Sequence, residues 1–80
     1  MKNLWKVTFD AKYTGRHSPM EETVKVVANG DGMTAVAKAR KQVIGMTFED
    51  GPMGPQKRYV TRRCRYVKLQ GLEKLAEIDA

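Results

Sequence analysis

The sequence predicts an α+β fold with the element order ββαβ, in which a three-stranded antiparallel sheet carries one helix packed on one face. Three observations predict it. Apolar and polar residues alternate strictly over residues 5–13, a second alternating segment rich in valine follows at 21–28, and apolar residues recur with helical spacing over 33–44. Of the 80 residues, 41% are hydrophobic and 30% charged, so we expect one small globular domain over residues 1–80.

The first strand is the clearest element. In the segment WKVTFDAKY, residues 5–13, every odd position is apolar and every even position is polar. This period of two is typical of a strand with one buried face. The side chains expected to point toward the core are Trp5, Val7, Phe9, Ala11 and Tyr13.

The second strand is predicted over residues 21–28, EETVKVVA, because valine and threonine favour a pleated, half-buried surface. Its inward side chains are Val24, Val26 and Ala28. A glycine and a proline in the link at 14–20 favour a turn. Two adjacent strands joined in this way are expected to pair as an antiparallel hairpin.

One helix is predicted from Met33 to Ile44. Asp31 is suited to its N-cap, because a carboxylate accepts hydrogen bonds from the free N–H groups of the first turn. Gly45 is suited to the position after the helix end. The apolar arc expected to face the sheet comprises Met33, Val36, Ala37, Val43 and Ile44, with Ala39 at its edge.

Residues 46–56 are predicted to form a flexible loop, because two glycines and two prolines fall within the stretch GPMGP. A third strand is predicted over 58–69, with a change of register in its middle. Its apolar residues change parity along the segment, which a β-bulge would reconcile. Val60, Cys64 and Tyr66 share one parity, and Val67 and Leu69 share the other.

The C-terminal segment after Gly71, LEKLAEIDA, allows two interpretations. Leu72, Leu75 and Ala76 have the spacing of a short amphipathic helix. The alternative is a frayed, extended end.

Positive charge is concentrated in one part of the chain. The formal net charge is +6, and residues 51–70 carry six basic residues and no acidic one. A localised basic patch attracts polyanions more strongly than dispersed charge does. The residues predicted to contact nucleic acid are the bases Lys57, Arg58, Arg62, Arg63, Arg65 and Lys68, with Tyr59 and Tyr66 beside them.

Nucleic-acid binding through a basic sheet face is therefore the function we expect. Arginine binds phosphate oxygens bidentately, and tyrosine rings stack on exposed bases. The sequence does not indicate whether the ligand is DNA or RNA, and Lys6, Lys12 and Lys25 would extend the patch. The alternatives are a solvated basic face without a partner, or an adaptor or inhibitor that binds an acidic partner protein through a sheet edge or the 46–56 loop. Homodimerisation through an edge strand fits either function.

An enzyme is not expected. His17 is the only histidine, and Cys64, the only cysteine, is expected to point inward as a structural residue. Together they are too few for a zinc site, and no cofactor motif is present, so no metal or cofactor is expected. With a single cysteine no intrachain disulfide forms, and no run is apolar enough to span a membrane, so we expect a cytoplasmic protein.

The succession of the segments WKVTF, TVKVVA and AVAKA, followed by a terminal strand, resembles that of small accessory proteins encoded by bacteriophages. The resemblance is one of pattern and rests on no specific motif. It implies a host-cytoplasm setting and a role in nucleic-acid binding or in modulating a host protein. It assigns no site residues.

Overall fold

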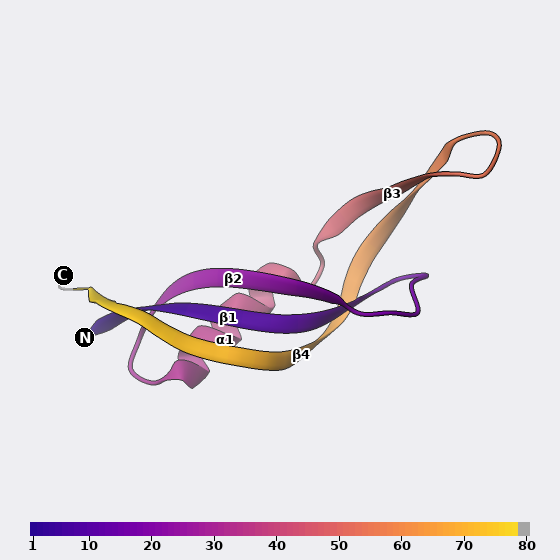
Figure 1. The fold of residues 1–80 in the computed structure, drawn as a ribbon. Helices are drawn as coiled ribbons and strands as arrows, with labels where there is room; N and C mark the ends of the chain where they lie inside the picture. Colours follow the sequence, from indigo (N-terminus) through magenta and orange to yellow (C-terminus); the bar gives the residue numbers. More distant parts are fainter. Residues whose placement is uncertain (79–80) are drawn as a thin grey trace.

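The structure, a computed structural model, describes residues 1–78 (Figure 1). It confirms an antiparallel sheet with one helix, but the sheet has four strands in the order β2-β1-β4-β3, and the element order is ββαββ. The predicted three-stranded sheet was therefore wrong by one strand. The elements are β1 (Lys2–Tyr13), β2 (Met20–Asn29), α1 (Gly32–Val43), β3 (Thr47–Met53) and β4 (Arg58–Ile78).

The predicted hairpin of the first two strands is confirmed. β1 and β2 pair antiparallel, with Val7 opposite Val24 and Trp5 opposite Val26. The alternating pattern of β1 directs every second side chain toward the core, as predicted. Its buried side chains are Val7, Phe9, Ala11 and Tyr13, and Trp5 packs against them while partly exposed.

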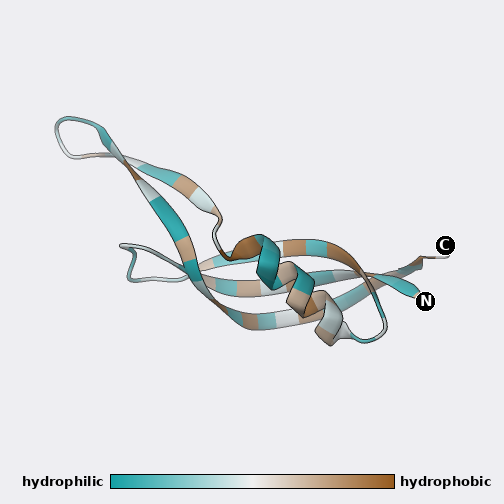
Figure 2. Ribbon diagram, turned by 180° about the vertical axis from the view of Figure 1, so that it is seen from behind, coloured by the Kyte–Doolittle hydropathy of each residue, from teal (hydrophilic) through white to brown (hydrophobic). Residues whose placement is uncertain are grey.

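The helix has the predicted caps but a different buried face. The carboxylate of Asp31 accepts a hydrogen bond from the Met33 N–H (3.2 Å), and Gly45 has a positive φ of 92°. Figure 2 shows α1 lying across one face of the sheet. Met33 and Ile44, expected to face the sheet, are 65% and 41% exposed. Ala37 is also exposed, whereas Val36, Ala39 and Val43 are buried as predicted and Ala35 is buried beside them.

This rotation of the helix follows from side-chain size. Ala35 and Ala39 let the helix backbone approach the sheet closely, and Val36 and Val43 complete a compact apolar layer. The helix has 12 residues, and no helix in the described part of the chain is long and apolar enough to cross a membrane.

The segment predicted as a loop contains strand β3. Thr47 to Asp50 pair with β4, and the ladder resumes at Met53 after a register shift. The shift accommodates Gly51 and Pro52. Proline is tolerated here because β3 is an edge strand and the irregularity relieves it of a ladder hydrogen bond. The prediction of an irregular loop over 46–56 was therefore wrong for most of its length.

The C-terminal segment is a strand and not a helix. β4 continues to Ile78 and pairs with β1 along almost all of β1, from Tyr13 opposite Cys64 to Lys2 opposite Ile78. Leucine, glutamate, lysine and alanine favour helix, but this preference is weak beside the pairing of a whole strand. The last two residues of this segment, 79–80, lie outside the described residues.

The predicted register change in the last strand is present. Lys12 is opposite Tyr66 but Tyr13 is opposite Cys64, so Arg65 is an extra residue at a bulge. Cys64 and Val67 both point into the core, because the bulge reverses the parity between them. Further shifts follow at residues 70 and 75 of β4.

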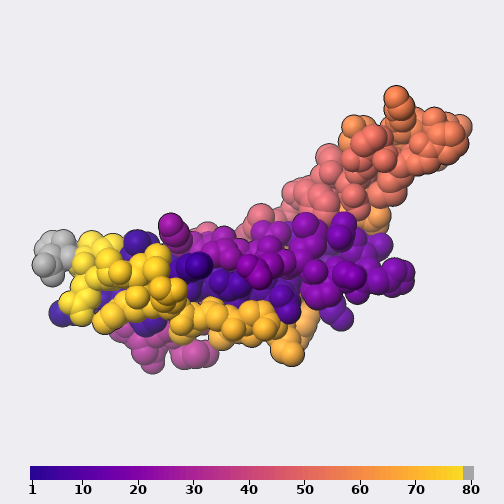
Figure 3. Space-filling model, viewed as in Figure 1, coloured from indigo at the N-terminus to yellow at the C-terminus, as the bar shows by residue number. Residues whose placement is uncertain are grey.

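The molecule has a body and an arm. The body consists of β1, β2, α1 and residues 64–78 of β4, and the arm is the hairpin of β3 with residues 58–63 of β4. The arm projects beyond the body (Figure 3). The radius of gyration is 15.5 Å, against about 12 Å for a compact chain of this length.

Candidate nucleic-acid interface

The six predicted basic residues do not form one compact patch. They follow β4 from the arm into the body, and five of the six are exposed. Both predicted tyrosines are also exposed, Tyr59 by 60% and Tyr66 by 57%. Lys57 and Arg58 lie at the arm tip, Arg62 and Arg63 at its base, Arg65 at the bulge and Lys68 in the body.

Pairing shows which arm residues share a face. Phe48 lies opposite Arg62 and packs edge-on against the buried ring of Tyr13, with 5.0 Å between ring centroids. Arg62 is therefore on the face of the sheet that carries the helix. Tyr59 and Arg63, at odd spacing from Arg62, lie on the opposite face, which the helix leaves open.

The same open face continues into the body across the bulge. Tyr66 is opposite the exposed Lys12, and Lys68 is opposite Asp10, both on the outward side of β1. Arg65, the extra residue of the bulge, is exposed between the arm and the body. We call these residues the basic strip: Lys12, Tyr59, Arg63, Arg65, Tyr66 and Lys68.

The spacing within the basic strip suits an extended polyanion. Tyr59 and Tyr66 are seven residues apart on one strand, which corresponds to about 23 Å. Two acidic residues lie near the strip. Glu49 accepts a hydrogen bond from the Thr61 hydroxyl (2.6 Å), and Asp10 is opposite Lys68. Between Tyr59 and Tyr66, β4 itself carries bases and no acid, and Glu49 of β3 lies opposite Thr61 on the same face.

Arg62 has a structural role that the sequence did not indicate. Its side chain is only 15% exposed, and its Nε lies 3.1 Å from Asp50 Oδ2. Its Nη1 donates to the carbonyl of Thr14 (3.2 Å), and Arg16 contacts the same Asp50 oxygen at 3.5 Å. These contacts join the arm to the β1–β2 turn. Gly15 lies under the Arg62 guanidinium, where a Cβ would collide with it.

The open face of the body is less basic than the strip. Lys6 and Lys25 are opposite each other on β1 and β2, as an extension of the patch would require. Farther along the same face, Asp10 of β1 is opposite Glu21 of β2. On the other side of β1, Glu73 of β4 is opposite Lys6. These carboxylates interrupt the positive field, so Lys6 and Lys25 are separated from the strip.

Cys64, Tyr13 and His17 lie outside the basic strip. Cys64 is 1% exposed, and burial raises the pKa of its thiol, as expected for a structural cysteine. Burial, and next the hydrogen bond to Glu22 (3.0 Å), raise the pKa of Tyr13 to about 12. His17 is exposed in the turn. Within residues 1–78, no three metal-ligating side chains are gathered.

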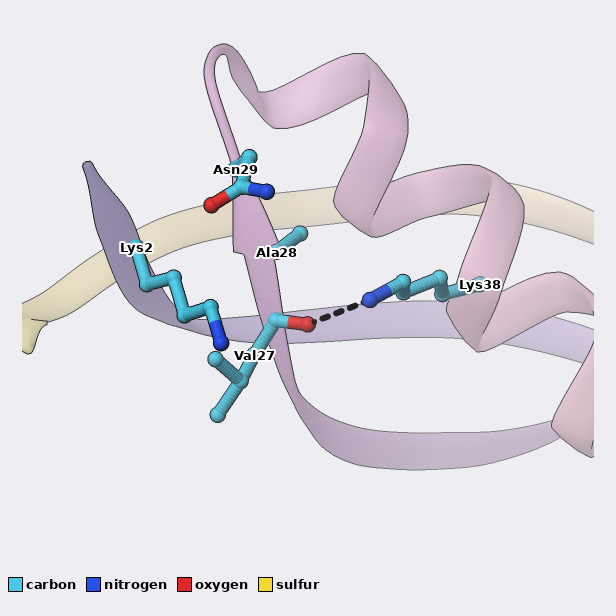
Figure 4. Close-up of a pocket in the computed structure, with 5 residues that line it drawn as sticks. All are labelled: Lys2, Val27, Ala28, Asn29 and Lys38. Carbon is cyan, nitrogen blue, oxygen red and sulfur yellow. Dashed lines mark hydrogen bonds between the residues drawn. The ribbon is translucent and has the colours of Figure 1, made fainter. Parts of the chain in front are cut away.

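A shallow recess lies at the opposite edge of the sheet, between β2 and the helix (Figure 4). Lys38 reaches across it and donates a hydrogen bond from Nζ to the carbonyl oxygen of Val27 (2.9 Å). The recess is lined by Lys2, Val27, Ala28, Asn29 and Lys38, so it belongs to a different surface from the basic strip.

Any functional interpretation of this chain depends on its own residues and their geometry. The strip combines exposed aromatic rings with guanidinium and ammonium groups on a face that the helix leaves open. Groups of these kinds can contact anions and flat rings. Comparison with known proteins gives no further guide, because no protein-family model, curated protein or solved structure matches the chain.

Proposed function

We propose that this chain is a non-enzymatic nucleic-acid-binding protein that holds a single-stranded segment along the basic strip. One observation carries the proposal. Tyr59 and Tyr66 are 60% and 57% exposed on the face of β4 that the helix leaves open, with Arg63 and Arg65 between them. Two exposed aromatic rings that flank two arginines can contact the bases and the phosphates of one strand.

The physical chemistry favours unpaired bases over a duplex. A tyrosine ring stacks only on a base whose face is accessible, which a duplex does not provide. Each such stack contributes about 1–3 kcal/mol. Arg63 and Arg65 supply the phosphate contacts, and Lys57 and Arg58 at the arm tip extend the attraction beyond them.

The second candidate is a protein-interaction adaptor or inhibitor with an acidic partner. Apolar side chains near the arm favour it, since Met46 and Val60 are each 41% exposed. Phe48, in the same segment, packs against the core and does not contribute to such a surface. The two candidates differ in their ligand, because only the first predicts affinity for a bare oligonucleotide.

The test is a salt titration of binding to labelled mixed-sequence oligonucleotides, single- and double-stranded, by fluorescence anisotropy. We expect tighter binding of the single strand. Arg63→Ala/Arg65→Ala should weaken binding and make the slope of log K against log salt shallower by about 1.4, which is roughly 0.7 for each lost phosphate contact. Tyr59→Ala and Tyr66→Ala should each weaken binding and leave the slope unchanged.

The matched control is Lys25→Ala/Lys41→Ala, which removes the same charge from exposed positions outside the strip. Its affinity should fall much less than that of the double arginine variant. Arg62 is left intact in every variant, because its removal would disturb the joint between arm and body. No binding by the wild type at low salt would refute the proposal, and equal losses in both double variants would refute the assignment to the strip.

A further inference from the structure

The two edges of the body sheet differ in how they are protected. β2, one edge, carries Glu21, Thr23 and Lys25 on its outward face, and Lys38 donates to the carbonyl of Val27. Charged side chains and capped backbone groups of this kind prevent pairing with another strand. At this edge Lys38 already occupies one backbone carbonyl.

The other edge of the body also carries charged side chains, among them Lys68, Glu73, Lys74 and Glu77. Beyond Cys64, β4 pairs with β1 on one side, and within residues 1–78 no strand pairs with its other side. We call residues 65–78 the free edge. It carries three exposed leucines, Leu69, Leu72 and Leu75, which are 37%, 38% and 38% exposed. An unpaired strand with exposed apolar side chains can serve as a template for another strand.

We propose that the free edge pairs with the free edge of a second copy of this chain, antiparallel, about a two-fold axis between Gln70 and Gly71. A two-fold axis of this kind is perpendicular to the sheet, and it extends the body from three strands to six. Both helices then lie on the same face. Dimers with two-fold symmetry are the commonest closed assemblies of soluble proteins.

The backbone directions permit this register. The Cys64 N–H donates to the Met46 carbonyl (2.8 Å), away from β1, so Cys64 and its partner Tyr13 are not hydrogen-bonded to each other. Hydrogen-bonded and non-hydrogen-bonded pairs alternate along the β1–β4 ladder. The β4 residues opposite Ala11, Phe9, Val7 and Trp5 therefore direct their backbone groups away from β1, toward the free side. Those residues of β4 are Val67, Leu69, Leu72 and Lys74.

The side-chain faces select the same register. The bulge at Gln70 reverses parity, so Leu69 and Leu72 both lie on the helix side, opposite Phe9 and Val7. About the proposed axis, Leu69 of one copy faces Leu72 of the other. The backbone groups of both point to the free side, so they form a hydrogen-bonded pair.

Charge is complementary in this register. Lys68 and Glu73 lie on the open face, opposite Asp10 and Lys6 of β1. The axis places Lys68 of each copy opposite Glu73 of the other, so two ion pairs form by symmetry. A shift of two residues in either direction places Lys68 opposite Gly71 or Leu75 and separates the leucines. In the proposed register the leucine pairs lie on the helix side and the lysine–glutamate pairs on the open face, as the pairing of each residue with β1 requires.

The first measurement is the mass of the wild-type chain by sedimentation equilibrium from micromolar to millimolar concentration. We expect a monomer–dimer equilibrium. Lys68→Glu and Glu73→Lys should each raise the dissociation constant about tenfold, because each creates two like-charge pairs. Lys68→Glu/Glu73→Lys should restore dimerisation. The matched control is Lys25→Glu on β2, which changes the charge equally and should leave the dimer intact.

Disulfide trapping tests the register. Lys68 and Glu73 of opposite copies form a non-hydrogen-bonded pair, with Cα atoms about 4.5 Å apart, a distance at which a disulfide forms. Within one chain the two positions are roughly 16 Å apart. Lys68→Cys/Glu73→Cys should therefore form a covalent dimer with oxidised glutathione, whereas either single variant should not. Far-UV circular dichroism confirms that each variant is folded.

A wild-type chain that stays monomeric at millimolar concentration would overturn the inference. So would a dimer whose double cysteine variant links no faster than the single variants, because that dimer would use another surface. Neither measurement involves nucleic acid, so this inference and the proposed function stand or fall separately.

Discussion

Adjacent arginines on β4 should behave in opposite ways when replaced by alanine. Arg62 points into the joint between arm and body, and Arg63 points to the open face. We expect Arg62→Ala to lower the free energy of unfolding by about 2 kcal/mol. We expect Arg63→Ala to change it by less than about 0.5 kcal/mol, as is usual for a surface substitution.

The magnitude for Arg62 follows from its contacts. It makes an ion pair to Asp50 at 3.1 Å and a hydrogen bond to the Thr14 carbonyl at 3.2 Å. A hydrogen bond to a charged group contributes about 1.5–3 kcal/mol. The total is reduced because the Asp50 side chain is 25% exposed and keeps Arg16 as a partner at 3.5 Å. About 2 kcal/mol therefore remains.

Urea denaturation followed by the fluorescence of Trp5, the only tryptophan, measures the difference. A loss of about 2 kcal/mol should also lower Tm by roughly 8–16 °C in a chain of this size. The contacts between Arg63 and Thr14 involve the Arg63 backbone, so Arg63→Ala retains them. Equal stability of Arg62→Ala and Arg63→Ala would refute the assignment of Arg62 to the joint. A double-mutant cycle with Asp50→Ala should return a coupling free energy of about 1 kcal/mol or more.

Three further predictions concern the core and the helix cap. Asp31→Ala should lower the free energy of unfolding by about 1 kcal/mol in thermal denaturation, because the Met33 N–H loses its acceptor. The pKa of Tyr13 is raised to about 12, so the unfolded chain loses this proton first as the pH rises. The contribution of protonated Tyr13 to the free energy of unfolding should be complete below about pH 10 and be lost as the pH approaches 12. Tyr13→Phe should lack this pH dependence. Burial raises the pKa of the Cys64 thiol, so Ellman's reagent should modify it about 100-fold more slowly in the native protein than in urea, and a fast native reaction would contradict its burial.

Elements with a strong local signal were predictable from the sequence. β1 alternates without error from Trp5 to Tyr13, and its buried set followed directly. The helix was bounded within one residue because Asp31 and Gly45 have local capping roles. Its rotation was not predicted, since the choice between Ala35 and Met33 as core residues depends on how closely the sheet approaches.

The missed strands depend on partners distant in the sequence. Residues 72–78 have helix-favouring composition, and they are extended because β1 offers an unpaired side. In β3, Phe48 is the only apolar residue from Thr47 to Asp50, so no alternation marks the strand, and the following glycine and proline suggested a loop. A register shift accommodates both residues in the strand.

The candidate site was predictable in composition and not in geometry. The run of bases on β4 is visible in the sequence, but nothing local distinguishes Arg62 from Arg63. The distinction depends on Asp50 and on the turn at Thr14, which reach Arg62 only in the folded chain. The bulge at Arg65 likewise decides that Tyr66 joins Tyr59 on the open face.

The pairing of β1 with β4 also sets how this protein must fold. The ladder joins residues at least fifty positions apart, from Tyr13 with Cys64 to Lys2 with Ile78. Most of the chain must be ordered before the β1–β4 ladder gains its contacts. We therefore infer that the local β1–β2 hairpin and α1 form before this ladder. Folding in milliseconds to seconds, rather than microseconds, is the expected consequence. Before this ladder forms, β1 lacks a partner on one side, and the chain is then most exposed to aggregation.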